Sequence, residues 1–186
     1  MTAFRPARGT ALASGTPRPL VGAPHPLLTS RADPVDPADP RVVAVAADLL
    51  ATMRHSRGCM GLAAPQIGVG WRLLSVDVSR HPRARSCAGE LVMANPRLVA
   101  ASRWEPAREG CVSVPGLVGD VPRATRITVR GEHPGTGASL TVHADAFEAR
   151  CIQHQLDHLD GVLFLDRVPG AWAVRRLEKR VKRRMA

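Results

Sequence analysis

The stretch Cys151-Ile152-Gln153-His154-Gln155-Leu156-Asp157-His158-Leu159-Asp160-Gly161 places two histidines four residues apart. Side chains at positions i and i+4 of a helix lie on one face, so both imidazoles can bind one metal ion. In the pattern H-E-x-x-H, the residue after the first histidine is a glutamate that transfers protons. Gln155 occupies that place here, and a glutamine can hydrogen bond but cannot titrate. The stretch therefore predicts a metal-binding helix without the usual proton-transferring carboxylate.

The two histidines need a third partner, because a catalytic site of the zinc type has three protein ligands and one open position. The best candidate is the thiolate of Cys111 in Glu109-Gly110-Cys111-Val112-Ser113, where the preceding glycine lets the backbone approach closely. Iron, zinc, nickel and cobalt all accept one thiolate and two imidazoles, so these donors alone do not select the metal.

The composition fits one compact domain. The chain has 186 residues, of which 45% are hydrophobic, which suits a single core. We expect its four cysteines to stay reduced, because no apolar block typical of a secretory signal stands at the N-terminus. No segment approaches the roughly 18 consecutive apolar residues of a membrane span. These features predict a cytoplasmic protein without membrane contact, with an organellar transit peptide as the alternative.

The formal net charge of +10 is concentrated towards the C-terminal end, where eight basic residues stand against two acidic ones from Asp166 onward. We expect a basic helix from Ala173 to Met185, with a thin apolar stripe. Such a segment is commonly a solvated helix face, and the same charge also favours contact with a polyanion such as ribosomal RNA.

Two regions precede the first strands. Prolines and glycines interrupt residues 1 to about 35, which predicts an extended lead-in over the surface, flexible over residues 1–20. Asp39 and Pro40 then have the form of an N-cap followed by proline at the first helical position. Apolar residues recur at helical spacing up to Arg57, so we expect a helix there.

The remaining elements predict the fold class. Short β-type runs separated by Gly, Pro and Asn indicate antiparallel strands around residues 71–78, 91–95, 127–130 and 140–143. A second helix is expected from Asp145 to about Leu159, with Glu148 completing a capping box and Gly161 ending the helix. The prediction is a single α+β domain with short antiparallel strands around a central metal-binding helix, followed by the basic C-terminal helix.

Three motifs together resemble the peptide deformylase family, which carries G-x-G-L-A-A-x-Q, E-G-C-x-S and H-E-x-D-H in that order. The corresponding stretches here are CMGLAAPQ at residues 59–66, EGCVS at 109–113 and HQLDH at 154–158. The similarity extends from about residue 20 to residue 167, which leaves residues 168–186 as a basic C-terminal helix or tail. Each motif alone is moderately specific, and the three in order are highly specific.

The resemblance implies a metal site and a reaction. Cys111, His154 and His158 would bind one divalent metal, which in this family is preferentially Fe²⁺, with Zn²⁺, Ni²⁺ or Co²⁺ as alternatives. The implied activity is hydrolytic removal of the formyl group from the N-terminal formylmethionine of nascent polypeptides. The implied partners are formylmethionyl peptides and, through the basic C-terminal tail, the ribosome.

The resemblance also assigns roles around the metal. The Gln66 amide and the Val112 backbone N–H would stabilise the oxyanion, and Gly61 would lie against an extended substrate peptide. The pocket for the methionine side chain would be lined by Met60, Phe147 and Cys151, of which Cys151 is otherwise a candidate for simple packing.

Two positions depart from the family pattern. Cys59 stands where the family has glycine, which is a small change if the backbone there needs no positive φ. Gln155 stands where the family has the glutamate that accepts and returns a proton, so a loss of about 10²–10⁴-fold in rate is expected. Glu109 and Asp157 are expected to support the site by hydrogen bonding rather than to replace that glutamate.

Other functions remain open from the sequence. The main alternative is a homologue that binds metal and formylated peptides with little or no turnover. A metallopeptidase is disfavoured, because the thiolate ligand and the flanking motifs differ from protease patterns. The remaining class is a nucleic-acid-binding protein that retains a vestigial site.

Overall fold

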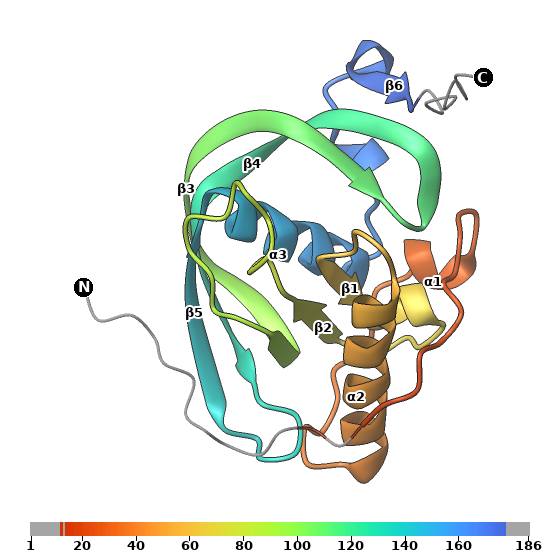
Figure 1. Cartoon of the computed structure of the whole chain (residues 1–186), viewed down its shortest axis with the longest axis vertical. Helices are drawn as coiled ribbons and strands as arrows, with labels where there is room; N and C mark the ends of the chain where they lie inside the picture. The colour runs from red at the N-terminus through yellow and green to blue at the C-terminus, as the bar shows by residue number, and fades with distance from the viewer. Residues whose placement is uncertain (1–11, 13, 178–186) are drawn as a thin grey trace, which may run out of the picture.

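The computed structural model describes residue 12 and residues 14–177. Its strands form one antiparallel sheet in this part of the chain (Figure 1). Neighbouring strands follow the order β1-β2-β3-β4-β5, and β6 pairs with β4 outside that path. In this part of the chain the strands are β1 (Gly61–Ala63), β2 (Leu73–Val76), β3 (Leu91–Cys111), β4 (Val114–Glu132), β5 (Ser139–Asp145) and β6 (Val174–Arg176). The helices are α1 (Pro26–Thr29), α2 (Pro40–His55) and α3 (Ala146–Leu159), with short 3₁₀ turns η1 (Ala64–Ile67), η2 (Phe164–Arg167) and η3 (Ala171–Ala173).

Helix α2 begins as the sequence predicts. The Asp39 carboxylate accepts a hydrogen bond from the Arg41 N–H at 2.8 Å, which satisfies one of the free donors of the first turn. Pro40 takes the first helical position, where its missing N–H leaves no bond unmade. The buried face of the helix, including Leu49 and Met53, packs on β1, η1 and β2 and forms a second hydrophobic cluster beside the main one.

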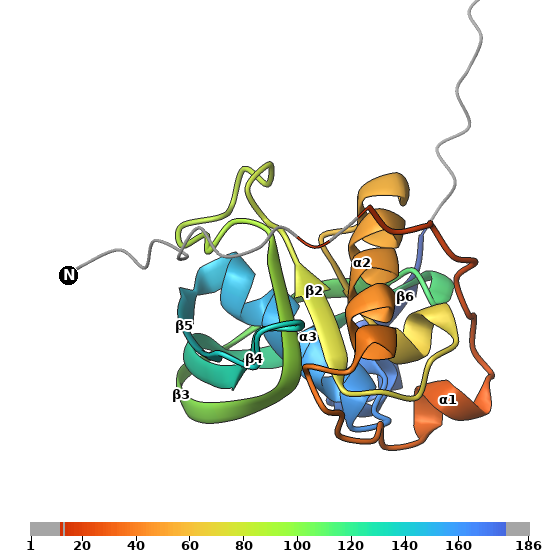
Figure 2. The ribbon, with the colours of Figure 1, turned by 90° about the horizontal axis from the view of Figure 1, so that it is seen from below.

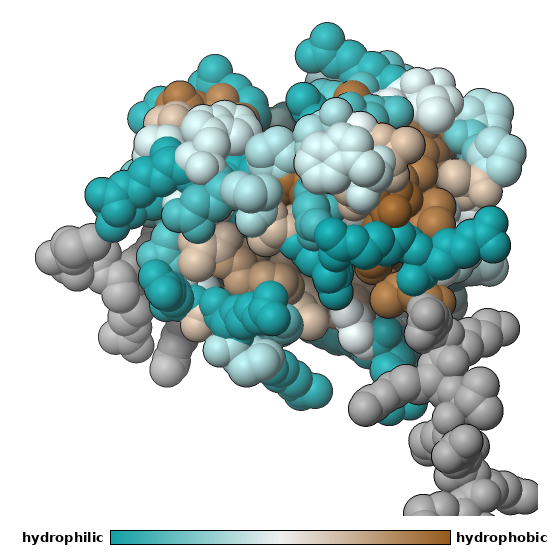
Figure 3. Space-filling view, turned by 90° about the horizontal axis from the view of Figure 1, so that it is seen from above, coloured by the Kyte–Doolittle hydropathy of each residue, from teal (hydrophilic) through white to brown (hydrophobic). Residues whose placement is uncertain are grey.

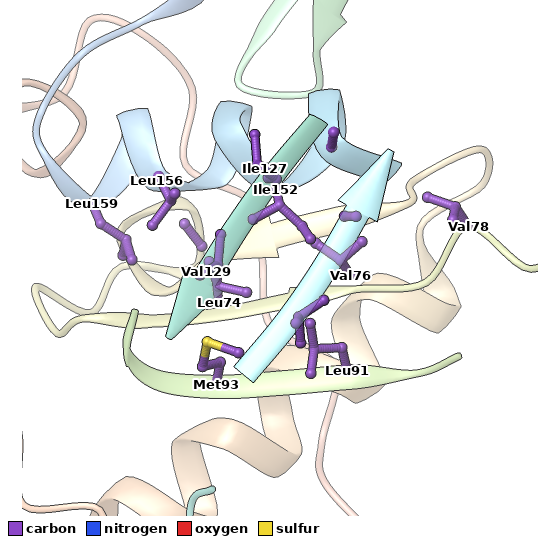
Figure 4. Packing of buried hydrophobic residues seen from close by; sticks show 14 of the residues in the cluster. Leu74, Val76, Val78, Leu91, Met93, Ile127, Val129, Ile152, Leu156 and Leu159 are labelled. Carbon is purple, nitrogen blue, oxygen red and sulfur yellow. The ribbon is translucent and has the colours of Figure 1, made fainter. Parts of the chain in front are cut away.

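Helix α3 lies against the sheet and supplies the main core. Ile152, Leu156 and Leu159 project from the helix among Leu74 and Val129 of the strands (Figure 4). Seen from below, the helix runs between the strands β3, β4 and β5 on one side and α2 on the other (Figure 2). The prediction of a single α+β domain with antiparallel strands around a central helix is confirmed, but β3 and β4 are much longer than the short strands expected.

Gly161 ends α3, as predicted, in the left-handed conformation with φ of 73°. A Cβ atom at this position would lie 2.8 Å from backbone atoms of Thr29 and Ser30. The site therefore requires glycine for two reasons, the backbone conformation and the close approach of the segment after α1.

A long hairpin made of β3 and β4 encloses α3 (Figure 1). Its ladder extends from Ala94 opposite Glu132 to Cys111 opposite Val114, with register shifts that bend it. The sequence predicts only the buried ends of these strands, because most residues from 97 to 108 are exposed and show no alternation. Seen from the end where the hairpin bends, hydrophilic side chains separate patches of apolar ones (Figure 3).

The predicted capping box of α3 is wrong. The Asp145 carboxylate accepts a hydrogen bond from the Ser86 N–H at 3.0 Å, and it makes none with the first turn of the helix. The Glu148 carboxylate accepts hydrogen bonds from the Ser86 hydroxyl at 2.6 Å and from the Ala88 N–H at 2.7 Å. Both carboxylates hold the loop before β3, a tertiary contact that spacing along the helix does not reveal.

The predicted helix from residue 173 is also wrong where the chain is described. Residues 174–176 form strand β6, in which Arg175 pairs with Val118 of β4. The Arg175 side chain forms an ion pair with Asp120 at 2.9 Å. Pairing with β4 outweighs the weak helical stripe of this segment. The rest of the predicted helix, and the first part of the predicted flexible lead-in, lie outside the described residues. Within residues 14–177, every helix is too short or too polar to span a bilayer.

The core predicts a difference between two leucine substitutions. Leu159 is fully buried and Leu98 is 43% exposed. Leu159→Ala should lower the free energy of unfolding by about 2–5 kcal/mol, because it leaves a cavity between α3 and the sheet. Leu98→Ala is the matched control and should cost about 0.5 kcal/mol or less. Urea unfolding of both variants measures the difference, and equal losses would contradict this description of the core.

Candidate metal centre

Three side chains from two distant segments converge on one point. Cys111 lies at the end of β3, and His154 and His158 lie on α3. Their sulfur and nitrogen atoms all fall within 4.8 Å of one another, and Cys111 Sγ is 3.2 Å from His158 Nε2. One thiolate and two imidazoles within this distance fit a divalent transition metal.

Local structure explains the convergence. The two histidines are one helical turn apart on the buried face of α3, with ring centroids separated by 5.0 Å. A register shift between Gly110 and Cys111 ends the regular ladder of β3 just before the tight turn at residues 112–113. The shift re-aims the cysteine side chain towards the helix.

A buried carboxylate orients the first histidine. Glu109 Oε2 lies 3.1 Å from His154 Nδ1, so the other ring nitrogen is left for a metal. The same carboxylate accepts two hydrogen bonds from Arg123 at 2.9 Å and one from Arg150 at 3.0 Å. Burial by itself raises the pKa of Glu109, and the contacts with His154 and Arg123 outweigh it and lower the pKa to about 2.

Asp157 supports the site indirectly, through Arg123. Its carboxylate pairs with Arg123 and with Arg167, the latter at 2.8 Å, and in the described part of the chain it bonds to neither histidine. Glu109 therefore bonds directly to the histidine, whereas Asp157 helps to fix the arginine behind it. The expectation that both groups form supporting hydrogen bonds fits these contacts.

The pKa values of Cys111 and His154 are shifted from their ordinary values in opposite directions. Burial raises the pKa of Cys111, but contacts with His154 and His158 outweigh burial and lower the pKa to about 5. Burial lowers the pKa of His154, but hydrogen bonds to Cys111 and Glu109 outweigh it and raise the pKa to about 9. Near neutral pH a thiolate therefore faces an imidazolium, and a metal must displace one proton to bind.

Gln155 lies where its side chain can reach the same point. It is buried, it lines the cavity beside the metal ligands, and its Oε1 has no hydrogen-bond partner in the part of the chain that the structure describes. Its amide packs on Gly61, where an added Cβ would come within 3.0 Å of Gln155 Nε2. Glycine at position 61 leaves room for this side chain.

The cavity next to Cys111 and His154 has a volume of about 270 Å³. Met60, Phe147 and Cys151, the residues predicted for a methionine pocket, all line it, as do Arg108 and Arg150. Burial raises the pKa of Cys151 to about 12, so this thiol stays neutral. A neutral thiol suits packing rather than metal binding. The use of this cavity as a pocket for a methionine side chain stays a prediction.

Gln66 is held at the edge of the cavity by three contacts. Its Oε1 accepts a hydrogen bond from the Ala63 N–H at 3.0 Å, and its Nε2 donates to the Ser113 hydroxyl at 3.2 Å. The third contact, from Nε2 to Cys111 Sγ, is long at 3.6 Å. Val112 lies in the turn beside it and lines the cavity. Both residues predicted to supply oxyanion donors therefore line the same cavity, and their roles stay predictions.

Three residues that support the site are not predicted from the sequence. Arg123 and Arg150 balance Glu109, and Ser113 fixes the Gln66 amide. Ser113 belongs to the cysteine motif, which is a signal, whereas nothing near Arg123 or Arg150 in the sequence marks them among the other arginines. Cys59 has no positive φ, so a side chain is accepted there without backbone strain.

Comparisons with known proteins agree with this geometry. The family model described as Polypeptide deformylase matches residues 17–172. A peptide deformylase of Bartonella henselae is 38% identical over 169 residues, which cover 89% of this chain and 93% of that protein. A class I type b peptide deformylase from Acinetobacter baumannii with Met-Ala-Ser bound has a TM-score of 0.75 and 30% identity, covering 83% of this chain and 99% of that one. The peptide deformylase of Thermotoga maritima gives a TM-score of 0.73 and 31% identity, covering 83% of this chain and 99% of that one.

The carboxylate behind His154 should control metal affinity. Glu109→Gln removes a charged acceptor from His154 Nδ1, and we expect a loss of about 10–100-fold in affinity for Zn²⁺ or Ni²⁺. Asp157→Asn is the matched control, because it also removes a buried carboxylate from Arg123 but touches neither histidine. Competition with a chromophoric chelator measures both variants. Equal losses would show that Glu109 acts only through the general charge balance.

Metal affinity should also depend on pH. Between pH 7 and the pKa of His154 near 9, Cys111 is already a thiolate and binding displaces one proton, from His154. The affinity should then rise about tenfold per pH unit over this interval and level off above it. Chelator competition at several pH values, corrected for the chelator's own protonation, measures the slope. In Glu109→Gln the rise should end at a lower pH, and an affinity independent of pH from 6 to 8 would contradict the assignment.

Proposed function

The chain belongs to the polypeptide deformylase family, and on that premise we propose that it removes the formyl group from the N-terminal formylmethionine of nascent polypeptides at a rate reduced by Gln155. The family consists of metal-dependent hydrolases. The observation that carries the proposal is the convergence of Cys111, His154 and His158, of which Cys111 and His154 line a cavity together with Gln66 and Gln155.

The three ligands would hold one divalent cation. When bound, such a metal polarises a carbonyl oxygen and makes a water more acidic, which is the chemistry that amide hydrolysis needs. The preference for Fe²⁺ is carried over from the family, since the donors would equally accept Zn²⁺, Ni²⁺ or Co²⁺.

Gln66 and Val112 would stabilise the negative charge that develops on the formyl oxygen. The Gln66 amide is already fixed by Ala63 and Ser113, so little reorganisation is needed when the charge appears. Its long contact to the thiolate leaves one N–H able to turn towards that oxygen. Each such donor is worth about 3 kcal/mol in comparable enzymes.

The peptide would bind along the edge strand β1. This strand pairs with β2 on one side, and Gly61 begins it beside the cavity. An extended peptide can add to such an edge by main-chain hydrogen bonds. The methionine side chain would then enter the cavity lined by Met60, Phe147 and Cys151, whose apolar and polarisable surfaces suit a thioether.

Gln155 sets the rate in this proposal. Its free Oε1 can accept a hydrogen bond from a water and orient it, but an amide cannot take that proton and return it to the leaving amine. Glu109 is a poor substitute, because His154, Arg123 and Arg150 occupy its oxygens and its pKa is lowered to about 2.

A second function uses the same residues. The chain would bind metal and formylated peptides without useful turnover, and the observation in its favour is the absence of a titratable side chain at position 155. A cytoplasmic location also stays a prediction. Contact of the basic C-terminal run with the ribosome stays one too, since residues 178–186 of that run lie outside the described part.

Restoring a carboxylate should separate these two functions. Gln155→Glu should raise kcat/KM for a formyl-Met-Ala-Ser peptide by about 10²–10⁴-fold, because a general base becomes available. Formate release, with metal content quantified in every sample, measures the change. A detectable rate in the parent chain supports slow hydrolysis, whereas peptide binding without any formate supports the binding function.

Gln155→Ala serves as the control for that experiment. It removes the amide without supplying a base, so its rate should equal or fall below that of the parent. A gain in Gln155→Ala as large as that in Gln155→Glu would show that relief of packing against Gly61 causes the effect, and no gain in Gln155→Glu would show that glutamine is not the limiting feature.

A further inference from the structure

A second cavity adjoins the metal centre. It has a volume of about 580 Å³ and shares Arg108, Phe147 and Arg150 with the cavity beside the metal ligands. It is bounded by the loop before β3, the exposed middle of the β3–β4 hairpin and the beginning of α3. We call it the arginine cavity.

The arginine cavity carries a strong excess of positive charge. Its lining includes two acidic residues, Glu105 and Asp145, and six arginines: Arg83, Arg85, Arg103, Arg108, Arg126 and Arg150. Arg150 is committed to Glu109 and to three backbone carbonyl groups. Among the residues that the structure describes, the other five form no ion pair with a carboxylate. Their guanidinium groups are therefore available to an anionic ligand.

Several contacts fix the walls of this cavity. Ser86 bonds to Asp145 and Glu148, which holds the loop that carries Arg83 and Arg85. The His81 ring stacks on Phe147 with centroids 3.6 Å apart, so the same loop is anchored at a residue shared with the metal-site cavity. Part-buried contacts thus hold the loop wall and the beginning of α3 together at this cavity.

We propose that the arginine cavity binds the carboxylate of an acidic side chain in the same peptide whose first residue occupies the metal-site cavity. The proposal rests on the proposed function and adds a preference to it. Guanidinium groups match carboxylates through paired N–H donors, and Arg103 and Arg126 lie on adjacent strands of the hairpin wall. An extended peptide advances about 3.3 Å per residue, so the test places acidic residues at the third and fourth positions.

A peptide carboxylate fits this site better than a nucleic-acid backbone does. The two acidic residues in the lining, Glu105 and Asp145, oppose a run of phosphates but leave room for one carboxylate among the arginines. The cavity is concave and joined to the metal-site cavity through three residues, whereas a polyanion site is commonly an extended basic face.

Binding of two matched peptides tests the proposal. The metal-loaded full-length chain is titrated with formyl-Met-Ala-Glu-Glu and with formyl-Met-Ala-Gln-Gln by calorimetry at low salt. The acidic peptide should bind about fivefold more tightly, the order expected for exposed charge pairs, and high salt should remove the preference.

Two double variants locate the effect. Arg103→Gln/Arg126→Gln should bring the affinity for the acidic peptide down to that for its glutamine counterpart. Arg97→Gln/Arg130→Gln is the matched control, because it also removes one arginine from β3 and one from β4 but lies outside the arginine cavity. It should keep the preference, and equal loss in both variants would overturn the proposal in favour of a general charge effect.

The remaining outcomes are also decisive. Equal affinity of the parent for both peptides overturns the proposal and leaves the proposed function intact. If neither peptide binds, the proposed function is overturned and this inference with it. A single-stranded RNA oligonucleotide that binds more tightly than the acidic peptide, and is weakened by Arg103→Gln/Arg126→Gln alone, would make the cavity a nucleic-acid surface instead.

Discussion

The Glu109 carboxylate joins the hairpin to the helix at the centre of this protein. It belongs to β3 and bonds to His154 and Arg150 of α3 and to Arg123 of β4, all of them buried. A buried charge is tolerated only when it is paired and hydrogen bonded, so each member of this group depends on the others. His154 consequently receives its orientation from the same carboxylate that links the hairpin to α3.

Much of this arrangement can be predicted from the sequence, for physical reasons that differ by residue. His154 and His158 are separated by one helical turn, so spacing alone places them together. Cys111 cannot be placed by spacing, and its assignment depends on resemblance to a family. Arg123 is beyond either kind of reasoning, because its partner lies on another strand and one arginine in a sequence looks like any other. The capping box failed similarly, since Asp145 and Glu148 bond to a loop that is distant in sequence.

The long hairpin shows the limit of hydrophobic patterns. Sequence patterns identify strands by one buried face, and most residues of β3 from 97 to 108 are exposed. Backbone pairing with β4 defines this part of the strand, and the side chains contribute little to it. The same exposure leaves Arg103 and Arg108 free of carboxylate partners within the described part, which is why the middle of the hairpin carries charge next to the metal centre.

Strand β6 pairs with residues 117–119, which directly follow the tight turn after Cys111. The backbone at Leu177 is therefore tethered a few residues from the sulfur ligand in sequence, with the Leu177 N–H bonded to the Gly116 carbonyl. Tension on that end of the molecule, whether from an anchoring surface or from a fused domain, would be transmitted first to the ligand-bearing turn.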